Sequence, residues 1–300
     1  MKTVPIKHIP ANPSLEGLSR FIPNIVYSEA QGKQLHLDLL VPWTVERPGF
    51  SKRYPLIVFV QGSSWTVPDR GYEIPQLSFF ARHGYVVASV EHRSIFEGAP
   101  FPAFLEDVKC AIRFLRSQAD RYAIDSERVA IWGTSSGANA AMLAGLTGEA
   151  SEYITEENGD CSDSVQAVVG CFGPTDIKDM VWQARHAAGI EPVLTAAFGS
   201  DEQRWEEAMA AYSPLSLVSP EKDYPPFLLL HGNSDVEVPY EQMIRFAGRL
   251  SECGAEVSAV CVDGAGHEWD FWSQPVYDEI LDFLDQVLRK GLTIPAQRIF

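Results

Sequence analysis

Six short apolar runs, most of them ending in glycine, recur along the chain. They are YPLIVFVQG (54–62), GYVVASVEHR (84–93), RVAIWG (128–133), VQAVVGCFG (165–173), PFLLLHG (226–232) and EVSAVCVDG (256–264). These runs are nearly continuous rather than apolar at every second residue, which is the pattern of strands covered on both faces. Such strands belong to a parallel sheet between two layers of helices, so the runs predict an α/β chain.

Helical patterns lie between these runs, at about 74–83, 101–123, 136–147, 240–253 and 274–290. Because strands and helices alternate, we expect a single doubly wound domain over 1–300, with its ligand site at the carboxyl ends of the strands. The segment 24–42 differs, since its residues alternate in polarity around Gln31-Gly32. It predicts an N-terminal antiparallel hairpin beside the mostly parallel sheet.

One gap in this alternation is long. Residues 174–224 separate two predicted strands and contain a helical stretch, DEQRWEEAMAAY, among loop residues. Insertions of this length in a compact domain usually serve a function. We therefore expect 174–224 to form a small partial cap over the site.

The sequence GTSSG (133–137) follows one of the apolar runs and opens an alanine-rich helical pattern. A serine nucleophile on a sharp strand-to-helix turn needs small residues two positions before and after it, because the backbone is crowded there. Ser135 has Gly133 and Gly137 at those positions, whereas Ser136 does not have this spacing. Ser135 is therefore the predicted nucleophile. The backbone N–H of Ser136, at the start of the helix, is predicted to form half of an oxyanion hole.

An acid and a base follow in later turns, each three residues after the glycine that closes an apolar run. These residues are Asp235 and His267. His267 is the predicted base, which takes the proton of Ser135 and later returns it to the leaving group, while Asp235 fixes the tautomer of His267. A base of this kind predicts that kcat/KM falls below a pKa of about 6–7.

Several neighbouring residues receive secondary interpretations. Glu237 and Asp263 remain rival acids, because both lie near the same turns. His231 is interpreted as a hydrogen-bonding support for the Asp235 turn, and His92 as a satisfied polar residue that braces loops.

The second half of the oxyanion hole is expected in the turn after the first apolar run. Serine esterases often carry His-Gly-Gly-Gly there, whereas this chain has Gln61-Gly62-Ser63-Ser64-Trp65. The backbone N–H groups are still present, so Ser63 is the preferred donor, with Gly62 or Ser64 as alternatives. Ser64 and Trp65 are also predicted to line the substrate pocket, although an aromatic residue at this place is equally compatible with plain core.

Charge and cysteine content exclude several classes of partner. The chain has 40 acidic and 24 basic residues and a formal net charge of −16, which disfavours nucleic acid and anionic membranes. The five cysteines lack C-x-x-C spacing and the histidines lack metal-ligand spacing, so we expect no metal site. Reduced thiols are expected, with a Cys161–Cys171 bridge left open.

The N-terminal sequence has no signal-peptide pattern, and no apolar run approaches the length of about 18 residues that spans a bilayer. A cytoplasmic location is therefore expected, with secretion of a processed form left open. The sequence also leaves open whether the chain forms a homodimer.

Taken together, the motifs resemble the bifunctional feruloyl and acetylxylan esterase branch of the α/β hydrolases, close to the prolyl-oligopeptidase-like groups. The resemblance covers most of 20–290 and rests on VFVQGSSWT, YEIPQL, HRS, FPAFLEDVKCAIRFLR, IWGTSSG, HGNSDVEVPYEQ and GAGHEWD. It implies the α/β-hydrolase fold and hydrolysis of acetyl and feruloyl esters on plant xylan without a cofactor. The nucleophile, acid and base of the family match Ser135, Asp235 and His267.

The chain departs from the family pattern at two places. Thr134 stands where an acidic residue is expected before the nucleophile, and Gly137-Ala138 stands where a glycine pair is expected. These departures affect the expected specificity rather than the chemistry.

The sequence thus favours a serine carboxylesterase that acts through an acyl-enzyme on a small ester or an acylated oligosaccharide. One alternative is an arylformamidase-like amide hydrolase, because relatives with an H-G-G-x-W turn match at Trp65. A general short-acyl esterase is another. A remote alternative is a non-catalytic binding module on a hydrolase scaffold, although such scaffolds usually lose a member of the triad.

Overall fold

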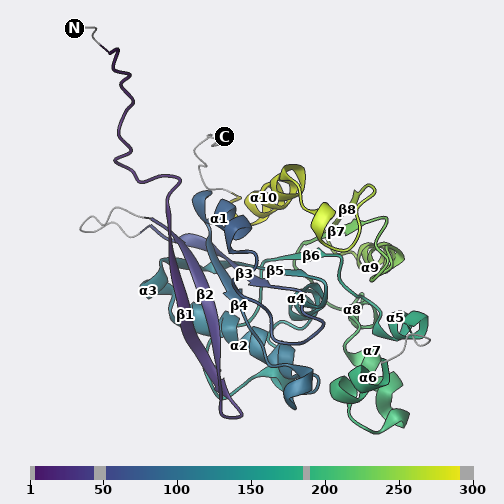
Figure 1. The fold of residues 1–300 in the computed structure, drawn as a ribbon. Helices are drawn as coiled ribbons and strands as arrows, with labels where there is room; N and C mark the ends of the chain where they lie inside the picture. Colours follow the sequence, from purple (N-terminus) through teal and green to yellow (C-terminus); the bar gives the residue numbers. More distant parts are fainter. Residues whose placement is uncertain (1–3, 44–51, 185–189, 291–300) are drawn as a thin grey trace.

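The computed structural model describes residues 4–43, 52–184 and 190–290 of the chain. Within these residues the centre of the molecule is an eight-stranded sheet in the order β1-β2-β4-β3-β5-β6-β7-β8 (Figure 1). Its strands are β1 (Ser19–Ala30), β2 (Lys33–Pro42), β3 (Tyr54–Val60), β4 (Val86–Val90), β5 (Ile124–Thr134), β6 (Ala167–Cys171), β7 (Phe227–Gly232) and β8 (Val257–Val262). Strands β3 to β8 pair in parallel, which confirms the predicted mostly parallel sheet.

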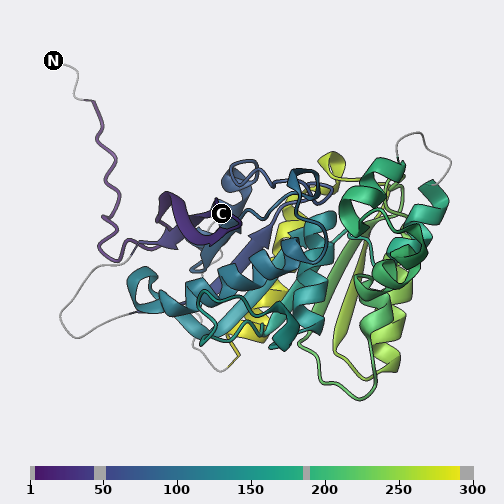
Figure 2. The same ribbon diagram turned by 90° about the horizontal axis from the view of Figure 1, so that it is seen from below.

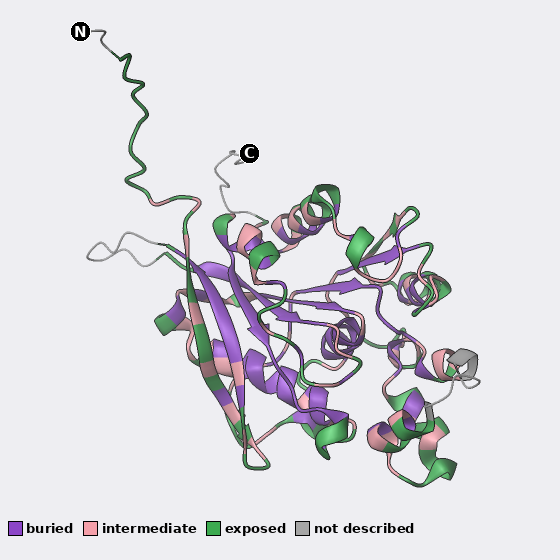
Figure 3. Cartoon of the chain, in the orientation of Figure 1, coloured by how far each residue is buried: buried purple, intermediate pink, exposed green. Residues whose placement is uncertain are grey.

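The hairpin β1–β2 forms the antiparallel edge, and β2 joins it to β4 in antiparallel pairing. Its turn is Gln31-Gly32, with φ angles of 53° and 78°. Positive φ at both turn residues suits the twist of an antiparallel hairpin, so the prediction for this segment is confirmed. Figure 3 shows that β1 is only partly buried whereas the strands inside the sheet are buried.

Helices cover both faces of the sheet. Helices α1 (Ile74–Arg82) and α10 (Gln274–Leu288) contribute to one hydrophobic cluster, and α2 (Ala103–Ser117), α4 (Ser136–Leu146) and α9 (Glu241–Glu252) contribute to the other. Successive residues of β3 alternate between the two clusters, so that Leu56 faces one layer and Ile57 the other. This explains the continuous apolar runs of the inner strands β3, β4, β6 and β7, because every position of these strands is buried by one layer or the other. The run at 256–264 differs, since it forms the edge strand β8, whose residues are exposed or half-buried.

The structure shortens some of the predicted elements. The pattern at 101–123 forms two helices, α2 and α3 (Ala119–Tyr122), and the second ends at Ala123 with a φ of 56°. The apolar runs continue past the strand ends, as at 54–62, where β3 stops at Val60. Their last residues form the turns that carry the predicted site.

The insertion at 174–224 folds into short helices, and its residues 185–189 lie outside the described ranges. The helices are α5 (Ile177–Ala184), α6 (Ile190–Phe198), η3 (Glu202–Arg204), α7 (Trp205–Ala211) and α8 (Pro214–Leu217). They lie at the end of the molecule away from the β1–β2 hairpin (Figures 1 and 2). Helix α6 contacts the short helix η1 (Ile95–Glu97), which follows the carboxyl end of β4. The insertion therefore reaches the carboxyl edge of the sheet, and its role as a cap stays a prediction.

Other expectations concern the cysteines and the membrane. All five cysteines are free thiols, so the Cys161–Cys171 bridge is not formed. Among the described helices, none combines the length and the apolar character needed to cross a bilayer.

Candidate active site

Ser135 occupies the turn between β5 and α4, with φ of 51° and ψ of −124°. Positive φ is unusual for a residue with a side chain and marks a strained turn. A Cβ added to Gly133 would lie 2.1 Å from the carbonyl oxygen of Gly137, and one added to Gly137 would lie 2.1 Å from that of Val60. The spacing of glycines that singled out Ser135 thus reflects close contact between backbones.

The structure brings Ser135, His267 and Asp235 into one hydrogen-bonded chain. His267 Nε2 lies 2.9 Å from Ser135 Oγ, and His267 Nδ1 lies 2.7 Å from Asp235 Oδ2. Asp235 follows β7 and His267 follows β8, so all three residues lie at the carboxyl edge of the sheet. With the proton on Nδ1 facing the carboxylate, Nε2 is free to accept the proton of the serine hydroxyl.

The electrostatics of this chain suit proton transfer. Burial lowers the pKa of His267, but its hydrogen bond to Asp235 and the negative charges around it raise that pKa above its ordinary value on balance. Burial alone would raise the pKa of Asp235, yet hydrogen bonds from His231, His267 and the Val238 N–H hold it well below its usual range. The carboxylate therefore stays ionised and can stabilise an imidazolium.

The rival acids are placed differently. Glu237 Oε2 is 4.0 Å from His267 Nε2, and the side chain of Glu237 is largely exposed. Asp263 accepts a hydrogen bond from Asn233 Nδ2 at 3.0 Å instead. Only Asp235 among the three acids is hydrogen-bonded to His267 Nδ1.

His231 and His92, which the sequence predicts to support the loops around the site, are both fully buried. His231 Nε2 lies 3.1 Å from Asp235 Oδ2, as expected of a support for that turn. His92 Nδ1 contacts the Arg93 carbonyl at 2.8 Å, but its Nε2 has no partner among the described residues. The interpretation of His92 as a satisfied group therefore holds for one nitrogen only, and burial lowers its pKa to about 4.

The predicted oxyanion-hole donors differ in availability. The Gly62 N–H donates to Thr134 Oγ1 at 2.8 Å, and the Ser63 N–H donates to Ser136 Oγ at 2.9 Å. Within the described ranges, the N–H groups of Ser64 and Ser136 donate no hydrogen bond. In this state Ser64, the alternative to Ser63, is the candidate donor whose N–H is unengaged, as is that of Ser136, and the oxyanion hole stays a prediction.

The departures at Gln61 and Thr134 have structural roles. Gln61 Oε1, in the place of the family histidine, accepts the Asp69 N–H at 2.6 Å and closes the loop after β3. Thr134 is fully buried, and its hydroxyl ties the nucleophile turn to Gly62. An acidic residue at Thr134 would place a carboxyl group in this buried contact.

Trp65, predicted to line the pocket, is 8% exposed and packs on Phe101 with ring centroids 5.4 Å apart. Its Nε1–H donates to Asn139 Oδ1 at 3.3 Å. These contacts place Trp65 in the core, and a contact with substrate remains a prediction.

Two residues that the sequence did not single out organise the loops around the site. Asn139, in the first turn of α4, donates from Nδ2 to the carbonyls of Pro174 and Tyr212, each at 3.1 Å. It thereby connects the nucleophile helix to the loop after β6 and to the insertion. Nothing in the G-x-S-x-G spacing distinguishes this asparagine from the small residues around it.

Arg70 is the other missed residue, and it holds the loop after β3 against the hairpin. It pairs with Asp38 on β2, donates to Glu91 Oε2 at 3.0 Å, and donates to Asn24 Oδ1 at 3.1 Å. The partners lie on three different segments, so only the folded sheet brings them together.

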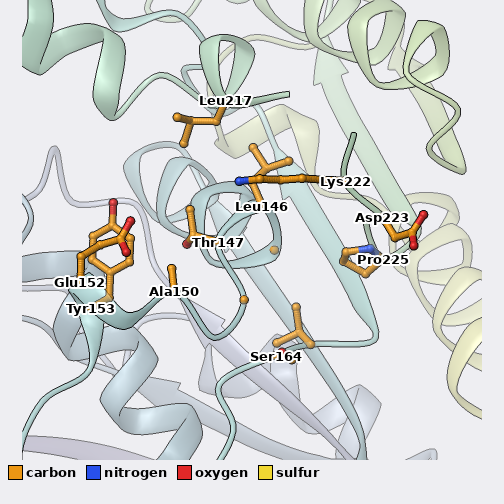
Figure 4. A pocket seen from close by; sticks show the side chains of 13 residues that line it. Leu146, Thr147, Ala150, Glu152, Tyr153, Ser164, Leu217, Lys222, Asp223 and Pro225 are labelled. Carbon is orange, nitrogen blue, oxygen red and sulfur yellow. The ribbon is translucent and has the colours of Figure 1, made fainter. Parts of the chain in front are cut away.

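A separate cavity of about 600 Å³ opens at the far end of α4 from Ser135 (Figure 4). Glu152 and Tyr153 line one side and Asp223 the other, with Lys222 extended near Leu146 (Figure 4). It includes none of the predicted site residues. In the part of the chain that the structure describes, no cluster of histidine, cysteine, aspartate or glutamate residues could hold a metal ion.

Comparisons with known proteins connect this geometry to esterases. The model of the BD-FAE family matches residues 38–250, a segment that contains Ser135 and Asp235 and ends before His267. Esterase LipC of Mycobacterium tuberculosis is 32% identical over 80% of this chain and 60% of its own length. Esterase LipQ of the same organism is 29% identical over 82% of this chain and 59% of its own. The chain thus spans about six tenths of the length of these relatives.

Solved structures share the fold. A truncated carbohydrate esterase from gut microbiota has 25% identity and a TM-score of 0.77, covering 93% of this chain and 100% of that chain. A bifunctional GH43-CE protein of Bacteroides eggerthii has 27% identity and a TM-score of 0.72, covering 92% of this chain and 38% of that chain. Esterase Est2 of Thermogutta terrifontis with bound propionate has 21% identity and a TM-score of 0.73, covering 95% and 98%, which shows the fold alone.

Proposed function

The chain belongs to the BD-FAE family of α/β-hydrolase proteins, and from this premise we propose that it is a serine carboxylesterase. The observation that carries the proposal is the hydrogen-bonded chain from Ser135 Oγ through His267 to Asp235, with distances of 2.9 and 2.7 Å. The named esterases among its relatives support the same reaction class.

We propose the following steps for the reaction. Ser135 Oγ attacks the ester carbonyl while His267 Nε2 takes the serine proton, and the N–H groups of Ser136 and Ser64 receive the charge on the carbonyl oxygen. The C–O bond to the alcohol then breaks, and His267 returns the proton to the departing oxygen. Water attacks the acyl-enzyme with His267 again as base, which releases the carboxylic acid and restores Ser135.

For the substrate we propose acetyl or feruloyl esters of plant carbohydrate such as xylan. Two of the structural relatives support a carbohydrate substrate by name, one as a carbohydrate esterase and one as a GH43-CE protein. The acyl group would occupy the space bounded by the loop after β3, whose Ser63 and Ser64 replace the glycines of related enzymes.

Hydrolysis of p-nitrophenyl acetate tests the reaction class. We expect Ser135→Ala to lower kcat/KM by about 1000-fold or more, because no other group replaces the nucleophile. Ser251→Ala, which alters an exposed serine on α9, is the matched control and should keep wild-type activity. Equal hydrolysis by wild type and Ser135→Ala would refute a role for Ser135.

A panel of acetylated xylo-oligosaccharide, methyl ferulate and an N-formyl arylamine tests the substrate. Turnover of either of the first two supports the carbohydrate-ester proposal. Turnover of the formamide alone would favour an amide hydrolase, and turnover of p-nitrophenyl acetate alone would indicate a general short-acyl esterase. Binding of oligosaccharide without any turnover would indicate a non-catalytic module.

A further inference from the structure

The catalytic acid of the proposed esterase is held by a second histidine. Asp235 Oδ2 lies 2.7 Å from His267 Nδ1 and 3.1 Å from His231 Nε2. His231 lies near the end of β7, and its side chain is fully buried. One carboxylate oxygen therefore faces two imidazoles.

The tautomer of His231 follows from its neighbours. Its Nε2 faces two acceptors, Asp235 Oδ2 and the Val238 carbonyl at 2.9 Å. A lone pair on Nε2 would meet lone pairs on both oxygens, so the proton must lie on Nε2. Nδ1 then carries the lone pair, and it has no partner among the described atoms. His231 also lines a cavity of about 10 Å³ whose other walls are mostly apolar.

The same contacts close the turn that carries the acid. The N–H groups of Glu237 and Val238 donate to Asp235 Oδ1 at 2.9 and 3.0 Å, while His231 connects Oδ2 to the Val238 carbonyl. Both oxygens of Asp235 are thereby held by contacts other than the one to His267. Since the direction of the carboxylate sets the orientation of His267, a shift of this turn would misalign the base.

We infer that His231 is a positioning residue, which shares its Nε2 proton between Asp235 and the Val238 carbonyl and thereby aims the carboxylate at His267. The inference rests on the proposed serine esterase reaction. Hydrogen bonding by His231 is the largest of the contributions that lower the pKa of Asp235, which agrees with this role.

Several titratable groups surround the pair and enter any pH profile. Glu237 and Glu268 act on His267 from the turns beside it. Tyr240, before α9, packs its ring at 5.9 Å from that of His231. Cys261 of β8 is the register partner of His231. All four residues are unchanged in the variants below, so their effects cancel in the comparison.

Three substitutions at His231 separate hydrogen bonding from packing. The amide nitrogen of glutamine reaches the place of Nε2, that of asparagine reaches only the place of Nδ1, and leucine fills space without a donor. We expect His231→Leu and His231→Asn to lower kcat by about tenfold or more with KM within about twofold, because binding is untouched. His231→Gln should recover most of kcat.

The dependence of kcat/KM on pH distinguishes loss of the hydrogen bond from loss of packing, because loss of packing alone would not change the pKa of His267. With the carboxylate less well aimed, the imidazolium of His267 loses stabilisation and its pKa falls. The acid limb of kcat/KM should then shift to lower pH by about 0.3–0.5 unit in the leucine and asparagine variants and return in the glutamine variant. NMR titration of His267 measures the same pKa without substrate.

The matched control is His92→Leu, which removes a second histidine that is fully buried and lies far from Asp235 in the sequence. It should lower thermal stability and leave the acid limb in place. The inference is overturned if His231→Leu keeps wild-type kcat, if the glutamine and leucine variants lose equal activity, or if His92→Leu shifts the limb equally. A wild type without ester hydrolysis would overturn the proposed function instead, and the NMR titration would still decide the role of His231.

Discussion

The proposed nucleophile and the proposed acid–base pair of this chain are held by different forces. At the turn between β5 and α4, close approach of backbones fixes Ser135, since any Cβ on Gly133 or Gly137 would lie within 2.1 Å of a carbonyl oxygen. At the turns after β7 and β8, hydrogen bonds to a buried carboxylate fix Asp235 and His267.

The difference predicts two kinds of sensitivity. Among the residues that the structure describes, no titratable side chain takes part in the close contacts of Gly133 and Gly137 at the nucleophile turn. The stability of this turn should therefore depend on added side-chain volume and not on pH. The acid–base turns depend on the ionisation of Asp235 and His267, so they should respond to charge more than to volume. This contrast is tested by one substitution that changes charge at the acid–base turns and one that adds volume at the nucleophile turn.

The largest effect is expected at the acid. Asp235→Asn keeps the side-chain volume but presents an amide to the donors of His231 and His267, so His267 no longer holds its proton on Nδ1. We expect kcat to fall by about 10⁴-fold with a folded protein. The measurement is kcat on p-nitrophenyl acetate, with circular dichroism to verify folding.

Asp263→Asn is the control for this substitution, because Asp263 is the rival acid that bonds to Asn233. It should keep wild-type kcat. A comparable loss in Asp263→Asn would contradict the assignment of the acid.

The second effect is steric and concerns stability. Gly137→Ala adds one methyl group, which would lie 2.1 Å from the carbonyl oxygen of Val60. We expect the free energy of unfolding to fall by about 4 kcal/mol or more, at every pH, because backbone rather than a flexible side chain must move. Urea unfolding at two pH values measures it.

Gly248→Ala is the matched control, since a Cβ there meets nothing within 4 Å and the residue lies in α9. Alanine should raise stability at this site by about 0.5–1 kcal/mol, because it favours the helix. If both variants unfolded at the same urea concentration, backbone contact would not be what specifies the nucleophile turn.

The contrast also explains how much could be predicted from the sequence. The strands and the β1–β2 hairpin were predictable because burial of both faces leaves a direct signal in the apolar runs. The nucleophile turn was predictable because close backbone contact demands glycine at a set spacing. The break between α2 and α3 was not, since it falls at Gln118, where no glycine or proline marks it, and α3 then ends at Ala123 with positive φ.

The state of the predicted oxyanion hole required the folded structure. Which N–H groups are free depends on the hydroxyls of Thr134 and Ser136, which bond to Gly62 and Ser63 across 72 and 73 residues of sequence. The contacts of Asn139 depend in the same way on distant loops, and so does the hydrogen bond that Gln242 Oε1, on α9, accepts from the Thr175 N–H at 2.9 Å. Such pairings carry no local pattern, because serine, threonine and asparagine suit many turns equally well.

A third test concerns the buried carboxyl group of Glu73, which lies outside the proposed triad. Glu73, at the start of α1, is 8% exposed, and neither carboxyl oxygen has a partner among the described residues. Burial raises its pKa to about 8, and the negative charges of Glu268 and Asp69 add to the shift. Glu268 directly follows His267. Glu73 is therefore coupled to the acid–base turns, whose behaviour depends on charge.

Glu73→Gln should therefore produce a small effect that depends on pH. The folded protein keeps the Glu73 proton up to a pKa of about 8, whereas the unfolded chain releases it near 4.5, so wild-type stability falls as pH rises between these values. Glutamine has no proton to lose, and its advantage should grow from near zero at pH 5 to the order of 1–3 kcal/mol at pH 9. Urea unfolding at pH 5, 7 and 9 measures it, with the exposed Glu279→Gln of α10 as control. A constant difference across this range would mean that Glu73 is already ionised and paired in the folded protein, and the charge sensitivity would then be confined to Asp235 and His267.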